Sequence, residues 1–188
     1  MCQAPRPSEN TPAAVTSVER SIVSIHYVLR DGITISQVPT PWIERHNGSV
    51  ADLTRFLEAQ VGAYDDALAE LRRGRKTGHW IWFIFPQIAG LGHSGMSRHF
   101  AISSLNEATA YLAHPVLGAR LRECTRAVLA TGGRTAEQIL GSTDAMKLRS
   151  CMTLFHHAAP EEALFVRVLE RYYDGVADAR TDELLRPT

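Results

Sequence analysis

A helical repeat of apolar residues constrains the fold of this chain more than any other feature. From Asp52 onward, apolar side chains recur at spacings of three and four, which places them on one face of an α-helix. The first such face is formed by Leu53, Phe56, Leu57, Val61, Tyr64, Leu68 and Leu71. Similar patterns predict helices near residues 104–113, 115–131, 143–155 and 160–173, with a short one from Thr181. The sequence therefore predicts a mainly α protein, with a compact single-domain helical fold over residues 51–188.

Local signals mark where several of these helices begin and end. Ser104 with Glu107, and Thr135 with Gln138, have the spacing of capping boxes, in which side chains at a helix start satisfy each other's backbone N–H groups. Gly74 is a suitable stop for the first helical region, because glycine readily adopts the backbone conformation that ends a helix.

The first fifty residues have a different character. Residues 1–20 are rich in Pro, Ser, Thr and Ala without periodicity, which predicts a disordered tail. Residues 21–50 form a possible hairpin and linker, because β-branched runs at Ile22–Leu29 and Ile33–Ile35 flank Asp31-Gly32, a strong two-residue turn signal. The alternative is that this extension has no role in the folded protein.

Composition excludes several classes of protein. The 20 basic and 20 acidic residues balance, so no global charge favours nucleic acid. No apolar run is long enough to span a membrane, and no secretory signal opens the chain. Three widely spaced cysteines fit a reducing cytoplasm better than a disulfide framework. We expect a cytoplasmic protein; the sequence leaves its oligomeric state open.

The stretch from His79 to Gln87 concentrates aromatic residues. It contains Trp80, Trp82, Phe83 and Phe85 in a chain that is only 7% aromatic. Such side chains bury large areas, and Trp also needs a partner for its N–H group. We expect this stretch to be both a hub of the core and the floor of a pocket.

Gln60 is a polar residue in the middle of the first apolar face. A buried amide without partners is costly, so it must be hydrogen-bonded. We expect it to contact the loop between Pro86 and Ser94. It either serves as a structural hydrogen bond or orients a ligand.

A second polar group lies along one flank of the helix predicted at 143–155. Helical spacing aligns Asp144, Lys147 and Cys151, with Ser150 further round. Either the group is a helix cap with a weak ion pair, or Lys147 and Ser150 are phosphate or ribose ligands at the edge of a cleft. Cys151 itself is expected to be a small core residue.

Basic residues lead into the aromatic stretch. Arg75 and Lys76 precede His79, and Ser94 opens a Gly/Ser-rich loop that offers backbone N–H groups to anions. The basic run is either a solvated helix end or one side of an anion site. Adjacent His156 and His157 point apart on a helix, so we expect no metal site and no cofactor.

The chain from Leu53 to Leu185 closely resembles a bacterial domain-of-unknown-function family, number 1810, which is sometimes labelled calpastatin-like. The matching words are Arg55-Phe56-x-x-Ala59-Gln60, Gly74-Arg75-Lys76-x-x-His79-Trp80-x-Trp82-Phe83-x-Phe85-Pro86-Gln87-x-x-Gly90-Leu91-Gly92-x-Ser94, His114-Pro115-x-Leu117 and Lys147-Leu148-x-Ser150-x-Met152-Thr153-Leu154-Phe155. Where the family has a second serine, this chain has Cys151. The resemblance implies a compact, mostly helical cytoplasmic domain and implies no activity.

The phrase Phe56-x-x-Ala59-Gln60 also bears a much weaker resemblance to NADAR-type N-glycosidases, which act on ADP-ribose-like compounds. It sharpens one functional hypothesis, in which an anionic, nucleotide-like small molecule binds among the following residues: Gln60, Arg75, Lys76, Trp82, Gln87, Ser94, Lys147 and Ser150. If the ligand is hydrolysed, His79 is the acid or base, because it titrates near neutral pH, and Asp144 helps to expel the leaving group. The alternative is a structural or interaction module in which the same residues form the core.

Overall fold

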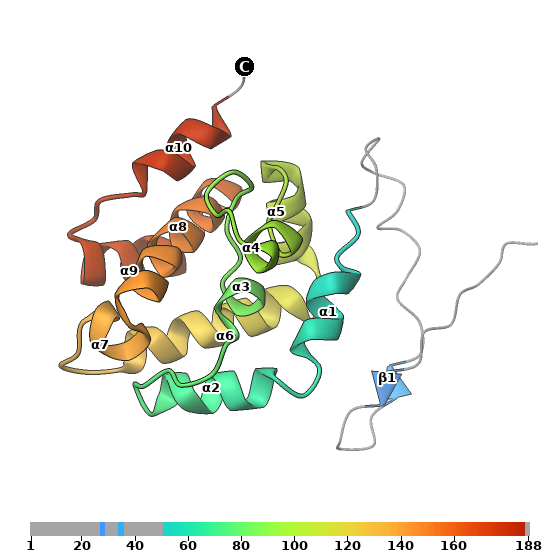
Figure 1. The fold of residues 1–188 in the computed structure, drawn as a ribbon, viewed down its shortest axis with the longest axis horizontal. Helices are drawn as coiled ribbons and strands as arrows, with labels where there is room; N and C mark the ends of the chain where they lie inside the picture. Colours follow the sequence, from blue (N-terminus) through green and yellow to red (C-terminus); the bar gives the residue numbers. More distant parts are fainter. Residues whose placement is uncertain (1–26, 29–33, 36–50, 187–188) are drawn as a thin grey trace, which may run out of the picture. The chain divides into compact units, whose positions relative to one another are not determined.

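The computed structural model describes residues 27–28, 34–35 and 51–186. The chain divides into two units between Ser49 and Val50. The second unit contains ten helices in its described residues (Figure 1), which confirms the mainly α prediction. They are α1 (Thr54–Gln60), α2 (Tyr64–Arg72), α3 (Ile81–Ile84), α4 (Gly95–His99), α5 (Leu105–Ala113), α6 (Leu117–Ala130), α7 (Ala136–Leu140), α8 (Ser142–Ala158), α9 (Ala163–Tyr173) and α10 (Ala179–Leu185).

The described residues of the first unit form a short antiparallel strand pair, β1 (Tyr27–Val28) with β2 (Thr34–Ile35). Val28 pairs with Thr34, whereas a two-residue turn at Asp31-Gly32 would pair Val28 with Ile35. The observed register thus differs from the one that a two-residue turn gives, and the residues between the strands lie outside the described ones. The hairpin and linker over residues 21–50 therefore stay a prediction. The tail predicted for residues 1–20 lies outside the described residues.

Two long helices carry most of the packing in the helical unit. Helix α8 packs against α5, α7, α9 and α10, and α6 packs against α2, α5 and α9. A row of buried aromatic rings links four helices: Phe56 meets Tyr111 edge-on at 5.1 Å between ring centroids, Tyr111 lies 5.5 Å from Phe155, and Phe155 lies 5.9 Å from Phe165. No helix among the described residues is long and apolar enough to cross a membrane.

The first helical region is interrupted between α1 and α2. Gly62 has φ +75°, and Val61 is 75% exposed although the apolar repeat places it on the buried face. A left-handed residue cannot continue an α-helix, so the chain turns here and a second helix begins at Tyr64. The prediction that one face runs unbroken through Val61 is therefore wrong.

The predicted helix stop at Gly74 is confirmed. Gly74 has φ +67°, its N–H donates to Leu71 O, and the N–H of Arg75 donates to Glu70 O, which together form a Schellman motif. A Cβ atom added at Gly74 would lie 2.7 Å from Thr131 Cγ2. The end of α2 is thus both a left-handed turn and a close approach to the end of α6.

The two predicted capping boxes differ in outcome. Thr135 and Gln138 make both reciprocal bonds at the start of α7, as predicted. At α5, Ser104 accepts from the N–H of Glu107, but the Glu107 carboxylate binds Ser103 and Arg55 instead of returning to Ser104. The predicted bond from the Ser104 N–H to the Glu107 side chain is therefore wrong, because Arg55 and Ser103 hold the carboxylate.

His114 caps α6 with its side chain. Its Nδ1 atom accepts from the N–H groups of Val116 at 3.2 Å and Leu117 at 3.3 Å. An imidazole whose Nδ1 is an acceptor is neutral and carries its proton on Nε2. Burial also lowers the pKa of His114, in the direction this cap requires.

We predict that Gly74→Ala destabilises the protein by about 1–3 kcal/mol, because the new side chain requires a strained φ and meets Thr131. Gly95→Ala is the matched control, since Gly95 has no neighbour within 4 Å of the added Cβ. Urea unfolding followed by tryptophan fluorescence measures both. Equal stability of the two variants would contradict the assignment.

We predict that the wild-type protein loses stability as the pH falls through the histidine range, and that His114→Asn removes part of this loss. The folded-state pKa of His114 is below the unfolded value of 6.5, so the unfolded chain takes up the proton first; the stability that neutral His114 contributes is fully present above pH 6.5 and is lost as the pH falls from there through the folded pKa. Asparagine supplies an acceptor that does not titrate. Urea unfolding at several pH values, with exposed His93→Asn as control, tests this; identical pH profiles for wild type and His114→Asn would refute it.

Candidate functional site

The aromatic stretch lies largely in the core. Trp80, Ile81, Phe83 and Phe85 are buried around the single turn of α3, whereas Trp82 is half-buried. The prediction that this stretch is a hub of the core is confirmed. Trp82 is the large aromatic side chain of this turn that reaches partly to the surface.

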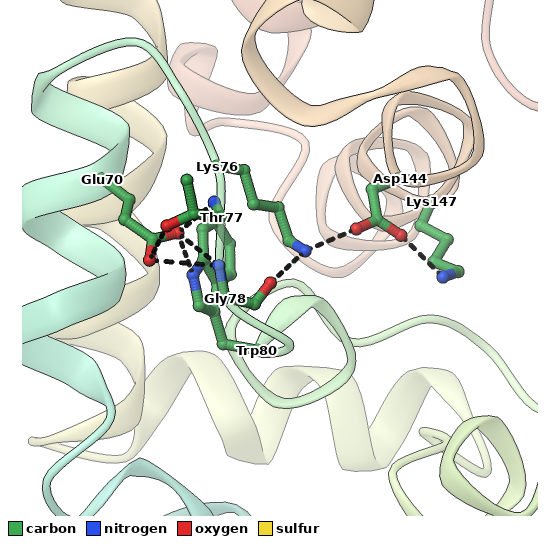
Figure 2. Close-up of polar contacts among 7 residues, drawn as sticks. All are labelled: Glu70, Lys76, Thr77, Gly78, Trp80, Asp144 and Lys147. Atoms are coloured by element: carbon green, nitrogen blue, oxygen red, sulfur yellow. Dashed lines mark hydrogen bonds and ion pairs between the residues drawn. The ribbon is translucent and has the colours of Figure 1, made fainter.

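The carboxylate of Glu70 on α2 organises the loop that precedes α3. It accepts hydrogen bonds from Thr77 N and Oγ1 at 2.7 Å each, from Gly78 N at 3.0 and 3.1 Å, and from Trp80 Nε1 at 2.8 Å. Figure 2 shows these donors converging on the two oxygens. Glu70 thereby fixes the loop and supplies the partner that the Trp80 N–H requires when buried.

Hydrogen bonding keeps Glu70 ionised although it is only 7% exposed. Burial by itself raises the pKa of this carboxyl, but the bonds from Gly78, Thr77 and Trp80 outweigh that effect and lower the pKa to about 2. Sequence reasoning did not single out Glu70. The available signal was the Trp80 indole, which needs a buried acceptor.

The same loop brings two lysines to one carboxylate. Lys76 Nζ lies 2.7 Å from Asp144 Oδ2, and Lys147 Nζ lies 2.7 Å from Asp144 Oδ1. Lys76 also donates to Gly78 O at 2.5 Å, and its backbone N–H donates to Ile139 O. This trio, Lys76, Asp144 and Lys147, is called the lysine cluster below; Figure 2 shows it beside the Glu70 bonds.

The charges of the lysine cluster do not cancel. Two ammonium groups share one carboxylate, which leaves a formal charge of +1. Burial raises the pKa of Asp144, but hydrogen bonds and charges from Lys147 and Lys76 outweigh it and lower the pKa. The carboxylate is therefore ionised at neutral pH and is a poor proton donor.

Each lysine also lies over a tryptophan ring. Lys147 Nζ is 4.7 Å from the ring centroid of Trp82, and Lys76 Nζ is 5.0 Å from that of Trp80. Cation–π attraction of this kind strengthens when the pair is shielded from water. The side chains of Lys76 and Lys147 are 8% and 20% exposed, so both are partly shielded.

The structure brings together four of the predicted site residues: Lys76, Trp82, Asp144 and Lys147. The others take separate positions. Arg75 and His79 are exposed on the loop between α2 and α3, and Gln87 is half-buried after α3, where its carbonyl accepts from Ile102 N.

Two predicted ligand residues make local bonds instead. Ser94 is the exposed N-cap of α4 and accepts from Ser97 N. Ser150 is buried in α8 and donates to Met146 O, one turn earlier. Neither of these hydroxyl bonds involves a residue of the lysine cluster.

Gln60 is 1% exposed, which confirms its predicted burial. Its amide donates to Phe83 O at 2.8 Å and to the Tyr111 hydroxyl at 3.2 Å, and its oxygen accepts from Arg120 Nη1 at 3.2 Å. The predicted contact with the loop between Pro86 and Ser94 is wrong. Its actual partners are far away in sequence, and their spacing gave no signal.

The described cysteines and histidines were considered as nucleophiles and metal ligands. Cys151 is fully buried, and burial raises the pKa of its thiol well above the usual value, as expected for a core residue. In residues 51–186 and the two short strands, no three His, Cys, Asp or Glu side chains are grouped as metal ligands would be.

These features define a class of small helical domain, in which a buried carboxylate fixes a tryptophan-bearing loop next to a lysine cluster. The chain belongs to the DUF1810 family, described as proteins of unknown function, and the family model matches residues 50–185. The resemblance seen in the sequence is thereby confirmed.

One solved structure is similar, the crystal structure of the conserved hypothetical protein Rv1873 from Mycobacterium tuberculosis. It is 50% identical with a TM-score of 0.72, and the match covers 73% of this chain and 98% of that one. A comparison with curated proteins finds no match. The similar proteins thus establish fold and family.

We predict that Glu70→Gln destabilises the protein by about 1–3 kcal/mol, because an amide has one acceptor oxygen and cannot accept from all four donors that the carboxylate binds. The folded pKa of about 2 lies below the unfolded value of 4.5, so Glu70 stabilises the fold above pH 4.5 and this contribution is lost as the pH falls toward 2. The variant should show a shallower fall in this window.

Urea unfolding across the acidic range measures both effects, and exposed Glu58→Gln on α1 is the control. If Glu70→Gln retains the wild-type pH profile, the carboxylate does not have the role described.

Proposed function

We propose that this domain binds an anionic, nucleotide-like small molecule at the lysine cluster, with Trp82 at its edge. The observation that carries the proposal is the pairing of two partly shielded ammonium groups with one carboxylate. The uncompensated positive charge attracts an anion, and the neighbouring tryptophan offers an aromatic surface.

The use of lysine supports the proposal. The sequence contains 20 basic residues, of which only Lys76 and Lys147 are lysines, and both contact Asp144. Everywhere else the chain uses arginine. A compact ammonium on a flexible stem is a point charge that can turn from one oxygen to another, whereas a planar guanidinium has a fixed fork.

Lys147 is the residue proposed to meet the ligand. An ammonium group has three donors. Lys76 uses two of them, on Asp144 and on Gly78 O, whereas Lys147 uses one, on Asp144, within the described part of the chain. Its remaining donors are free for a phosphate, and Trp82 can then pack against the ring of the ligand.

Binding is better supported than hydrolysis. Asp144 is ionised and doubly ion-paired, so it is neither a proton donor nor a strong base at neutral pH. His79 is exposed three residues after Lys76 and is the candidate acid or base if an N-glycosidase reaction exists. We assign the lysine cluster to ligand binding and leave Arg75 and Gln87 as candidates for its rim.

Because the chain has only two lysines, NMR can follow each lysine side chain separately. Lysine-selective ¹³C/¹⁵N labelling during expression reports on both side chains and leaves their three N–H donors in place. We predict that ADP-ribose shifts both lysine side-chain NMR signals in a saturable way, that AMP does so more weakly, and that inorganic phosphate shifts mainly Lys147. Affinity should therefore rise from inorganic phosphate to AMP to ADP-ribose.

Variants separate a ligand site from a purely structural cluster. Lys147→Ala should weaken ADP-ribose binding at least about tenfold, with little loss of stability, because a partly exposed ion pair contributes roughly 1 kcal/mol or less. Arg73→Ala removes an exposed charge nearby and serves as control. Unchanged binding in Lys147→Ala, or its unfolding, would assign the cluster to the core.

A further inference from the structure

A separate hollow of about 680 Å³ lies where the end of α5 meets the start of α6. Leu112, Ala113, Pro115 and Ala119 line its apolar part. It shares no lining residue with the lysine cluster, and its volume is in the range of small-molecule sites.

The wall of this hollow is held in place before any ligand arrives. Arg122 makes a two-pronged ion pair with Glu162, with N–O distances of 2.8 Å, and donates to Leu112 O at 3.1 Å. Gly118 permits this closeness of α5 and α6, because a Cβ there would lie 2.1 Å from Leu112 O. A prearranged wall lowers the cost of ordering on binding.

The charges in the hollow are matched except for one. Arg122 is neutralised by Glu162, and Glu123 by Arg72 at 2.9 Å. Arg126 lines the hollow and is exposed, and no carboxylate of the described residues lies within ion-pair distance of it. The site therefore offers one uncompensated guanidinium.

His114 adds a neutral donor to the lining. Its Nδ1 accepts from the backbone at the start of α6, so its Nε2 carries the proton. Arg126 also lines a second, adjoining hollow of about 360 Å³, whose floor includes Ala127 and Ala130. Arg126 thus lines both hollows, and each hollow is partly apolar.

We propose that this hollow is a second ligand site, which binds a monoanionic organic acid with an aliphatic body. Arg126 pairs with the carboxylate through two parallel N–H bonds, and the aliphatic chain covers the alanines, leucine and proline of the lining. A single unmatched positive charge suits one carboxylate, whereas a phosphate dianion would leave a negative charge without a partner. The aliphatic lining likewise favours a chain over a nucleobase.

The test uses octanoate as the probe, with acetate and inorganic phosphate as comparisons, followed by backbone amide NMR of the full chain. Octanoate should give saturable shifts centred on residues 112–126 and should bind at least about tenfold more tightly than acetate, because several methylene groups leave water. Phosphate should bind more weakly than octanoate.

Arg126→Gln should weaken octanoate binding about tenfold or more, and Arg167→Gln, which removes an exposed arginine of α9 outside the lining, should not. Equal losses in both variants, phosphate binding tighter than octanoate, or shifts located elsewhere would overturn the proposal. The amide spectrum of Arg126→Gln also reports whether the variant is folded.

Discussion

The hydrogen bonds of the buried Glu70 carboxylate hold the loop between α2 and α3 in place. Its bonds to Thr77, Gly78 and the Trp80 indole pull this loop against α2 and place the Trp80 ring in the core. Because the loop is fixed in this way, Lys76 is directed to Asp144 at the start of α8. One ionised group therefore connects the hydrophobic core to the lysine cluster.

The lysine cluster and the hollow on α6 differ in how they hold positive charge. In the cluster, two ammonium groups share one carboxylate, each on its own oxygen, and lie close to aromatic rings, which suits an anion that binds to the remaining donors of Lys147. On α6, neighbouring ion pairs are complete and a single guanidinium is left over. The first arrangement depends on unused donors of an ion-paired ammonium group, whereas the second depends on a guanidinium without a carboxylate partner among the described residues.

The sequence predicted those parts of the structure that depend on local spacing. Burial of one helix face, the glycine that ends α2 and the reciprocal cap of α7 all follow from residues within one or two turns. The break at Gly62 was missed because the apolar repeat continues across it, and only the exposure of Val61 reveals the turn. At the site, the burial of Gln60 followed from its position on the helix. Its partners did not, since Phe83, Tyr111 and Arg120 reach it through tertiary packing.

The bonds of Glu70 also have a consequence for how the chain folds. Their donors follow Glu70 by only 7, 8 and 10 residues. Loops of that length close in about 10–100 ns, long before distant helices find each other. Helix α2 and the tryptophan loop can thus assemble as one early unit, and contacts of low sequence separation speed folding. The Lys76–Asp144 pair bridges segments much farther apart, so it closes late, after α8 has docked. The segment from Glu70 to Trp80 is in this sense the part of the domain that we expect the chain to complete first.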